Sequence, residues 1–308
     1  MKFIERGSNN CSKPSPWKTR LCTGLAMVAT IGIPHLPPGV AHAVQSFETR
    51  TLRVTGYISY GLGQANPTTG ESPFTAVAAT GGFIHALLKP ENATFDAHRI
   101  DAKLQMKTQQ LIEAQATGGV KGDFPSQSPS GGSQMVKMNS QSMTYLTTPQ
   151  GAKIIFPTSV HLAMTKSVNQ ATADLQGDSG FLKLSRESNH QLEPSSGLLT
   201  GHVTFHYSSI QPAKSPKKPK TFYLTGTAES LRFMLLPNHQ YQLILNGHVH
   251  LRGSLGNTTS DTTTDTITVD LSSHFEPLDM NSNNEPADGN IQFKQKQGES
   301  GSSDHKKH

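Results

Sequence analysis

Cysteine is almost absent from this chain of 308 residues. Its two cysteines, Cys11 and Cys22, both lie ahead of any segment long enough to form a domain. The body of the chain therefore excludes a disulfide scaffold, a thiolate zinc site and a cysteine nucleophile. Apolar residues are also scarce: 34% of the chain is hydrophobic and the mean hydropathy is −0.44, which excludes a polytopic membrane protein.

Amphipathic helical periodicity is missing as well. The 27 glycines and 19 prolines, together with many Ser, Thr, Asn and Gln residues, interrupt long helices and suit short turns between strands. Catalytic signatures such as a phosphate-binding glycine loop, paired catalytic carboxylates or a nucleophile elbow are not present either. The composition favours an all-β protein that is not an enzyme and needs no cofactor.

The first 43 residues read as an export signal. Five basic residues precede an apolar run at residues 21–33, and the small residues Ala41 and Ala43 suit signal-peptidase cleavage before Val44. The apolar run is too short for the roughly 20 residues that span a bilayer. We therefore predict a cleaved signal peptide at residues 1–43 and a periplasmic location.

Most of the net positive charge belongs to this leader. Without its five basic residues and one acidic residue, the formal charge falls from +5 to +1. The pI of about 9.1 is thus mostly a property of the signal and gives no support to a nucleic-acid partner.

Beyond the leader, strand-like runs alternate with clusters of Gly, Pro, Ser and Asn. Residues 123–133 are expected to form a loop, and residues 277–308, which are almost without apolar side chains, a disordered polar tail. The predicted strands cover residues 51–60, 82–88, 98–115, 135–146, 152–164, 198–207, 221–233, 240–252 and 264–271.

Several of these runs have one clearly apolar face. In residues 152–164 the even-numbered positions are mostly apolar, and in residues 240–252 the odd-numbered positions are mostly apolar. Because successive side chains of a strand point to opposite faces, these runs predict a sheet with one apolar and one polar side. The runs also exceed the usual strand length of about 5 to 6 residues, which favours a stacked, extended sheet.

An internal repeat gives the strongest signal. The segment Leu245-Asn246-Gly247-His248-Val249-His250-Leu251 resembles Leu199-Thr200-Gly201-His202-Val203-Thr204-Phe205, and weaker copies place valines at Val120 and Val160. The intervals between these valines are 40, 43 and 46 residues. Such spacing indicates a repeated supersecondary unit of two strands and a turn.

These units resemble the OstA-like (organic solvent tolerance) family of periplasmic lipopolysaccharide-transport proteins, the LptA and LptC type. Histidine stands where the family usually has asparagine. The resemblance covers roughly residues 94–271 and implies an open β-jelly roll, a folded stack of long antiparallel strands. Because residues 44–276 are longer than an ordinary member, either the jelly roll is extended or residues 44–90 form something else.

The resemblance also implies a function and a site. Acyl chains of lipopolysaccharide or a similar acylated glycolipid would lie along the apolar faces during export to the outer membrane, without catalysis. Edge strands would pair with other lipopolysaccharide-transport proteins. The candidate lipid-binding residues are Ile100, Leu104, Ile154, Phe156, Val160, Leu162, Val203, Phe205, Leu243, Leu245, Val249 and Leu251. The same alternation would equally build an ordinary closed core.

Two alternatives remain open at this point. One is a secreted adhesive or structural β-repeat module that binds protein or carbohydrate through its polar face. The other is a metal-dependent enzyme that uses the pairs His248/His250 and His202/His206, although alternation places both pairs on the solvated face, so we predict no metal site. The protease-like segment Gly177-Asp178-Ser179-Gly180 lacks the other features of that class and is predicted to be a turn.

Overall fold

Strands form all of the regular secondary structure that is described. The computed structural model describes residues 46–282, except residue 90 and residues 128–132, 168–169, 187–191, 212–219, 238, 256–257 and 273–276. These residues belong to one unit, residues 44–308. The predicted signal peptide at residues 1–43 and the stretch 283–308 lie outside the described part of the chain. The described residues include no helix long and apolar enough to cross a membrane.

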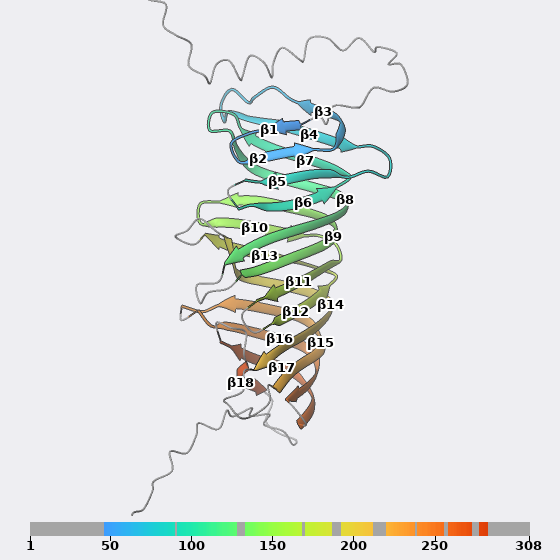
Figure 1. Ribbon diagram of the computed structural model, residues 1–308, viewed down its shortest axis with the longest axis vertical. Coiled ribbons are helices and arrows are strands. Elements are labelled where there is room, and N and C mark those ends of the chain that lie inside the picture. Colours follow the sequence, from blue (N-terminus) through green and yellow to red (C-terminus); the bar gives the residue numbers. More distant parts are fainter. Residues whose placement is uncertain are drawn as a thin grey trace, which may run out of the picture. The chain divides into compact units, whose positions relative to one another are not determined.

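The strands follow one another in chain order, as the colours of Figure 1 show. They are β1 (Ser46–Glu48), β2 (Leu52–Thr55), β3 (Tyr57–Leu62), β4 (Glu71–Ala78), β5 (Ile84–Leu88), β6 (Ala93–Ala97), β7 (Arg99–Gln105), β8 (Gln110–Gln127), β9 (Ser133–Thr148), β10 (Gly151–Phe156), β11 (Val160–Lys166), β12 (Ala171–Gly177), β13 (Ser179–Arg186), β14 (Leu192–Gln211), β15 (Lys220–Leu235), β16 (Tyr241–Leu255), β17 (Thr258–Leu271) and β18 (Pro277–Ser282).

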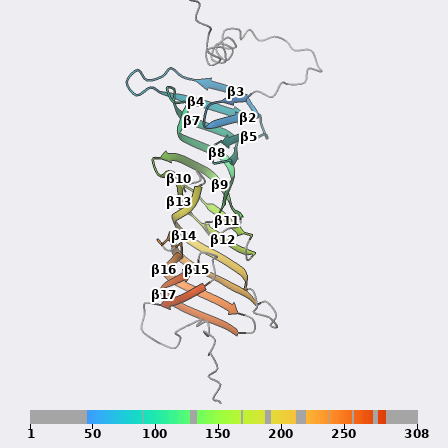
Figure 2. The same ribbon diagram turned by 60° about the vertical axis from the view of Figure 1, so that its left-hand side comes forward.

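The strands form two half-sheets, and each strand pairs with its neighbours in antiparallel fashion. Half-sheet A has the order β1, β2, β5, β6, β8, β9, β11, β12, β14, β15, β16, β17. Half-sheet B has the order β3, β4, β7, β8, β9, β10, β13, β14, β15, β16, β17, β18. The long strands β8, β9 and β14 to β17 run through both (Figure 2). The predicted all-β stack of long antiparallel strands is confirmed.

The glycine-containing repeat marks the corner at which long strands pass from one half-sheet to the other. Pairing of β14 with β15 is regular up to Thr200 and resumes at Val203, so Gly201 and His202 are left out of the ladder. Both have positive φ, 73° and 43°. Gly247-His248 on β16 has the same geometry, with φ of 78° and 45°, and Gly118-Gly119 on β8 has φ of 86° and 84°. Two consecutive left-handed residues thus turn the strand, which glycine permits at low cost.

The interior between the half-sheets is apolar. Each valine of the repeat follows its corner and is 3% exposed or less: Val120, Val160, Val203 and Val249. Aromatic rings pack over glycines on the neighbouring strand: a Cβ atom on Gly226 would lie 2.7 Å from the ring of Phe205, its register partner. All the buried apolar side chains of the two halves form a single cluster.

The strand boundaries differ from the predictions in several places. The predicted strand at residues 152–164 is broken at Pro157, where β10 ends at the corner, and the run at residues 98–115 is broken by a turn at residues 106–109. Residues 123–127, expected in a loop, extend β8. Pro125 is tolerated here because the pairing of β8 with β6 ends at Asp123, which leaves one side of β8 without a strand neighbour, while pairing with β9 continues.

The ends of the domain also differ from the expectation. Residues 46–88 form β1 to β5 of the same stack, so the jelly roll is extended. Residues 277–282, assigned to the disordered tail, form β18 and pair with β17, where Met280 is 5% exposed and faces Val269. One buried methionine on a polar strand was too weak a sequence signal to show this pairing.

Candidate functional site

The candidate lipid-binding residues lie inside the folded sheet. Eleven of them are at most 3% exposed, and Leu243 is partly buried and packs against the same cluster. They come from both half-sheets: those on half-sheet A are Val160, Leu162, Val203, Phe205, Val249 and Leu251, and those on half-sheet B are Ile100, Leu104, Ile154, Phe156, Leu243 and Leu245. The structure therefore brings all twelve into one apolar interior, in which the two halves pack against each other.

The two halves are joined differently on their two sides. At the corner, continuous strands link them. On the opposite side, called here the rim, the strands of each half end, and the contacts between the halves that the described residues show there involve side chains. The carboxylate of Glu91, in the β5–β6 turn of half-sheet A, accepts a 2.7 Å hydrogen bond from Arg186 at the end of β13 in half-sheet B. The Glu91 side chain is 7% exposed, so this ion pair is largely removed from water.

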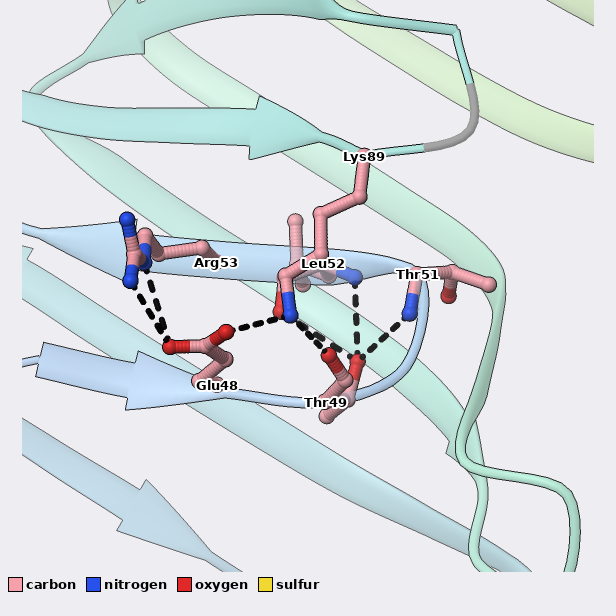
Figure 3. A network of polar contacts seen from close by, with 6 residues as sticks. All are labelled: Glu48, Thr49, Thr51, Leu52, Arg53 and Lys89. Atoms are coloured by element: carbon pink, nitrogen blue, oxygen red, sulfur yellow. Dashed lines mark hydrogen bonds and ion pairs between the residues drawn. The ribbon is translucent and has the colours of Figure 1, made fainter.

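A second rim contact lies at the β1–β2 turn (Figure 3). Thr49 closes the turn: its hydroxyl accepts a hydrogen bond from the Leu52 amide at 3.0 Å. Lys89, at the end of β5, donates to the Thr49 carbonyl at 2.6 Å and pairs with Glu48 at 2.5 Å. Next to this network, the Leu111 amide of half-sheet B donates to the Thr51 hydroxyl of half-sheet A at 2.8 Å.

Farther along the rim, polar side chains point into the interior. Lys166 ends β11 and is 2% exposed, and Glu193, near the start of β14, is also 2% exposed. Burial lowers the pKa of the Lys166 amine, while the nearby carboxylate of Glu193 acts in the opposite direction. The hydroxyl of Tyr241 donates to Glu193 at 2.9 Å. Charged and hydrogen-bonding groups thus border the apolar interior along its rim.

Gln134, at the start of β9, is the least satisfied of these groups. Its side chain is 2% exposed, and neither its amide nitrogen nor its amide oxygen has a hydrogen-bond partner among the described residues. It lines a hollow of about 450 Å³, which we call the rim pocket. The pocket is lined by Glu91, Asn92, Pro125, Ser133, Gln134, Met135, Thr165, Lys166, Ser167, Gln170, Ala171 and Thr172.

A neighbouring hollow of about 600 Å³ opens between the two halves. Arg50, Thr51 and Glu91 come from half-sheet A, whereas Tyr145 and Arg186 come from half-sheet B. Glu91 borders both hollows, so the two lie next to each other at the rim.

The sequence interpretation did not include these rim residues, although the sequence carried a signal for them. Lys166 has the same parity as Val160 and Leu162, and Gln134 has the same parity as Val136 and Met138. Polar residues that continue an apolar face at the end of a strand point toward the interior, and they need partners there.

The two histidine pairs, His202/His206 and His248/His250, lie on the outer face, as alternation predicted. His202 bonds Asp178 at 2.7 Å, with the imidazole 92% exposed, and His248 bonds Glu229 at 2.7 Å. His250 pairs with a different carboxylate, on β17. Within the described residues, no three His, Cys, Asp or Glu side chains come together as a metal site would require. The segment 177–180 joins β12 to β13, as predicted, although only Asp178 lies between the two strands.

Comparison with protein-family models, with curated proteins and with solved structures gives no match. The OstA-like resemblance therefore remains a prediction from the repeated motifs.

Proposed function

We propose that the protein is an exported, non-catalytic carrier that holds the acyl chains of lipopolysaccharide or a similar acylated glycolipid between its two half-sheets. The observation that carries the proposal is the layout of the interior: an apolar core in which the buried charged residues among those described, Glu91, Lys166 and Glu193, all lie at the rim. An amphipathic lipid has the same division between tails and head.

The rim is the side at which a guest can enter. Parting the halves there breaks side-chain contacts, whereas parting them at the corner would break the backbone of six strands. The core surface exposed by opening would be covered again by the acyl chains, at roughly 25 cal/mol for each Å² of apolar surface removed from water. Replacing contacts within the core by contacts with the acyl chains therefore needs little net free energy.

The ends of the stack suit transfer to a neighbour. β3 pairs with β4 on one side, and Ile58 and Leu62 on it are 64% and 44% exposed. At the other end, Leu278 on β18 is 40% exposed. Edge strands of this kind can pair with the edge of a partner protein, which would pass the lipid along a continuous sheet.

Two measurements on the purified full chain test the proposal. Organic extraction followed by mass spectrometry should recover an acylated glycolipid. In addition, a photoreactive phenylalanine analogue placed at Phe205, which is 1% exposed in the interior, should cross-link to that lipid in cells.

The matched control places the same analogue at Tyr223, an aromatic residue on the adjacent strand that is 52% exposed on the outer face. Cross-linking at Phe205 and not at Tyr223 supports transport in the interior. An extract without acylated lipid, together with no lipid adduct at either position, overturns the proposal and favours the adhesive β-repeat module.

A further inference from the structure

The hollow of about 600 Å³ between the two halves, called here the inter-sheet hollow, carries a net positive charge. Arg50 lines it from the β1–β2 turn of half-sheet A, and Arg186 lines it from the end of β13 in half-sheet B. Glu91 is the one carboxylate among the described residues of its lining. Two guanidinium groups against one carboxylate leave a charge of +1, which favours an anion.

Local structure fixes the backbone on both sides of Arg50. Thr49, which precedes it, closes the turn by accepting hydrogen bonds from the Thr51 and Leu52 amides at 3.3 and 3.0 Å (Figure 3). Thr51, which follows it, accepts from the Leu111 amide of half-sheet B at 2.8 Å. The Arg50 guanidinium itself makes no hydrogen bond or ion pair with the described residues, so its charge is available to a ligand.

Arg186 also keeps donors in reserve. Its Nη2 donates to the Glu91 carboxylate at 2.7 Å, and its backbone amide donates to the Gln150 carbonyl at 2.8 Å. A guanidinium has five N–H donors, and the others on Arg186 have no partner among the described residues. The ion pair with Glu91 therefore positions the guanidinium in the lining without using up its capacity to bind a second anion.

Tyr145, on β9, offers a third donor from the interior side. It is 2% exposed and lines the inter-sheet hollow, and its hydroxyl has no hydrogen-bond partner among the described residues. The hydroxyl oxygen is not sealed off, because it is absent from the side-chain atoms that are both fully buried and without a partner. Burial, with the charge of Glu91, raises the pKa of this phenol, so the hydroxyl keeps its proton at neutral pH and can donate.

A phosphate monoester matches this set of groups. Guanidinium groups bind phosphate through charge-assisted, often bidentate hydrogen bonds, and its three terminal oxygens can accept from both arginines and from the phenol. An uncharged sugar hydroxyl would leave the positive charge uncompensated. The volume of the hollow lies within the range of about 300–1,000 Å³ that is typical of small-molecule sites.

The hollow also connects the charged groups to the apolar interior. Leu88 and Leu111 belong to its lining and to the core cluster, and they are 1% and 3% exposed. A phosphate held by the arginines would thus lie beside the surface on which acyl chains are proposed to pack.

We infer that the inter-sheet hollow binds the phosphate group of a lipid head through Arg50, Arg186 and the hydroxyl of Tyr145. This inference rests on the proposed function and adds the charge of the head group: the acylated guest carries a phosphate that stays at the rim while its chains lie between the half-sheets.

Three probes test the inference by calorimetry on the full chain: octyl phosphate, octyl glucoside with the same tail, and inorganic phosphate. Both amphiphiles are kept below their micelle-forming concentrations. Arg50→Gln and Tyr145→Phe should each weaken octyl phosphate binding about tenfold, because each removes a hydrogen bond to a charged group, and should leave octyl glucoside within about twofold. Both variants should fold, since neither side chain loses a polar contact with the described residues.

Arg53→Gln is the matched control. It removes the same charge three residues farther along the chain, from a side chain that is 51% exposed and does not line the inter-sheet hollow. A general attraction between the anion and the surface would respond to both arginine variants. Octyl phosphate binding should therefore stay within about twofold of the native value in Arg53→Gln, and equal weakening by the two variants overturns the phosphate site.

The remaining outcomes separate the two proposals. Octyl phosphate binding that is unchanged in both Arg50→Gln and Tyr145→Phe overturns the phosphate site, and the carrier function then stands on the binding of octyl glucoside. Tighter binding of octyl phosphate than of inorganic phosphate supports a lipid head as the source of the phosphate. If inorganic phosphate binds as tightly as octyl phosphate and octyl glucoside does not bind, the site takes a free phosphate, and both the lipid head and the carrier function are overturned.

Discussion

Arg186 and Glu91 are 95 residues apart in the sequence, yet the guanidinium and the carboxylate meet at 2.7 Å across the rim. Because Glu91 belongs to half-sheet A and Arg186 to half-sheet B, this ion pair spans the side of the molecule on which no strand continues from one half to the other. It therefore ties the two halves together on the side opposite the corner.

Arg186→Met should destabilise the protein by about 2–4 kcal/mol, because it leaves the largely buried carboxylate of Glu91 without its cation. Urea unfolding followed by circular dichroism measures this loss. The double change Glu91→Leu with Arg186→Met removes both charges and should recover much of it.

The exposed pair of Arg53 and Glu48 supplies the comparison. Their side chains are 51% and 45% exposed, so Arg53→Ala should cost less than about 1 kcal/mol. If Arg186→Met costs no more than Arg53→Ala, the rim pair is not what holds the halves together.

The corner can be tested at Gly247. Its φ is 78°, and an added Cβ atom would lie 2.4 Å from the Glu229 carboxylate oxygen that borders it. Gly247→Ala should therefore cost about 1–3 kcal/mol in unfolding free energy. Gly61→Ala, where an added Cβ meets nothing within 4 Å, should stay within about 0.5 kcal/mol of the native value. Equal stability of the two variants would contradict the role assigned to the Gly-His corner.

Much of the fold was predictable because strand alternation and the repeat are local patterns. The apolar parity of residues 240–252 matches the buried face of β16, and the valine-centred repeat coincides with the corners. The corner itself was not predictable: sequence alternation does not distinguish a straight strand from one that bends at Gly201-His202. For the same reason, residues 152–164 looked like a single strand although Pro157 divides it in two.

The candidate site was only half predictable. Its apolar members follow from alternation within single strands. Its rim depends on which turns meet across the interior, and the Arg186–Glu91 contact joins segments that no local pattern relates. Lys166 and Gln134 carried a parity signal, but only the fold shows that Lys166 lies near Glu193 of the other half-sheet.

A pH titration tests the outer-face pair of His202 and Asp178. The hydrogen bond that the His202 imidazole donates to the Asp178 carboxylate, together with the negative charge of that carboxylate, raises the pKa of His202 above its usual value of 6.5. The folded state therefore binds the proton more tightly than the unfolded state. The resulting stabilisation is fully present below pH 6.5 and is lost as the pH rises through the raised pKa. In NMR titrations, Asp178→Asn should shift the His202 midpoint downward; an unchanged midpoint would show that the contact does not form in solution.

The interior and the rim can be linked in one experiment at Phe205. This ring is 1% exposed and packs over Gly226, so Phe205→Ala should cost about 3–5 kcal/mol and leave an apolar void. Benzene should bind in the void and raise the unfolding temperature of this variant, but not that of Tyr223→Ala, whose side chain is 52% exposed. If guests enter through the rim, adding Arg186→Met should speed benzene exchange measured by NMR, because the ion pair no longer holds the halves together. Equal exchange rates with and without the ion pair would mean that the guest enters by another route.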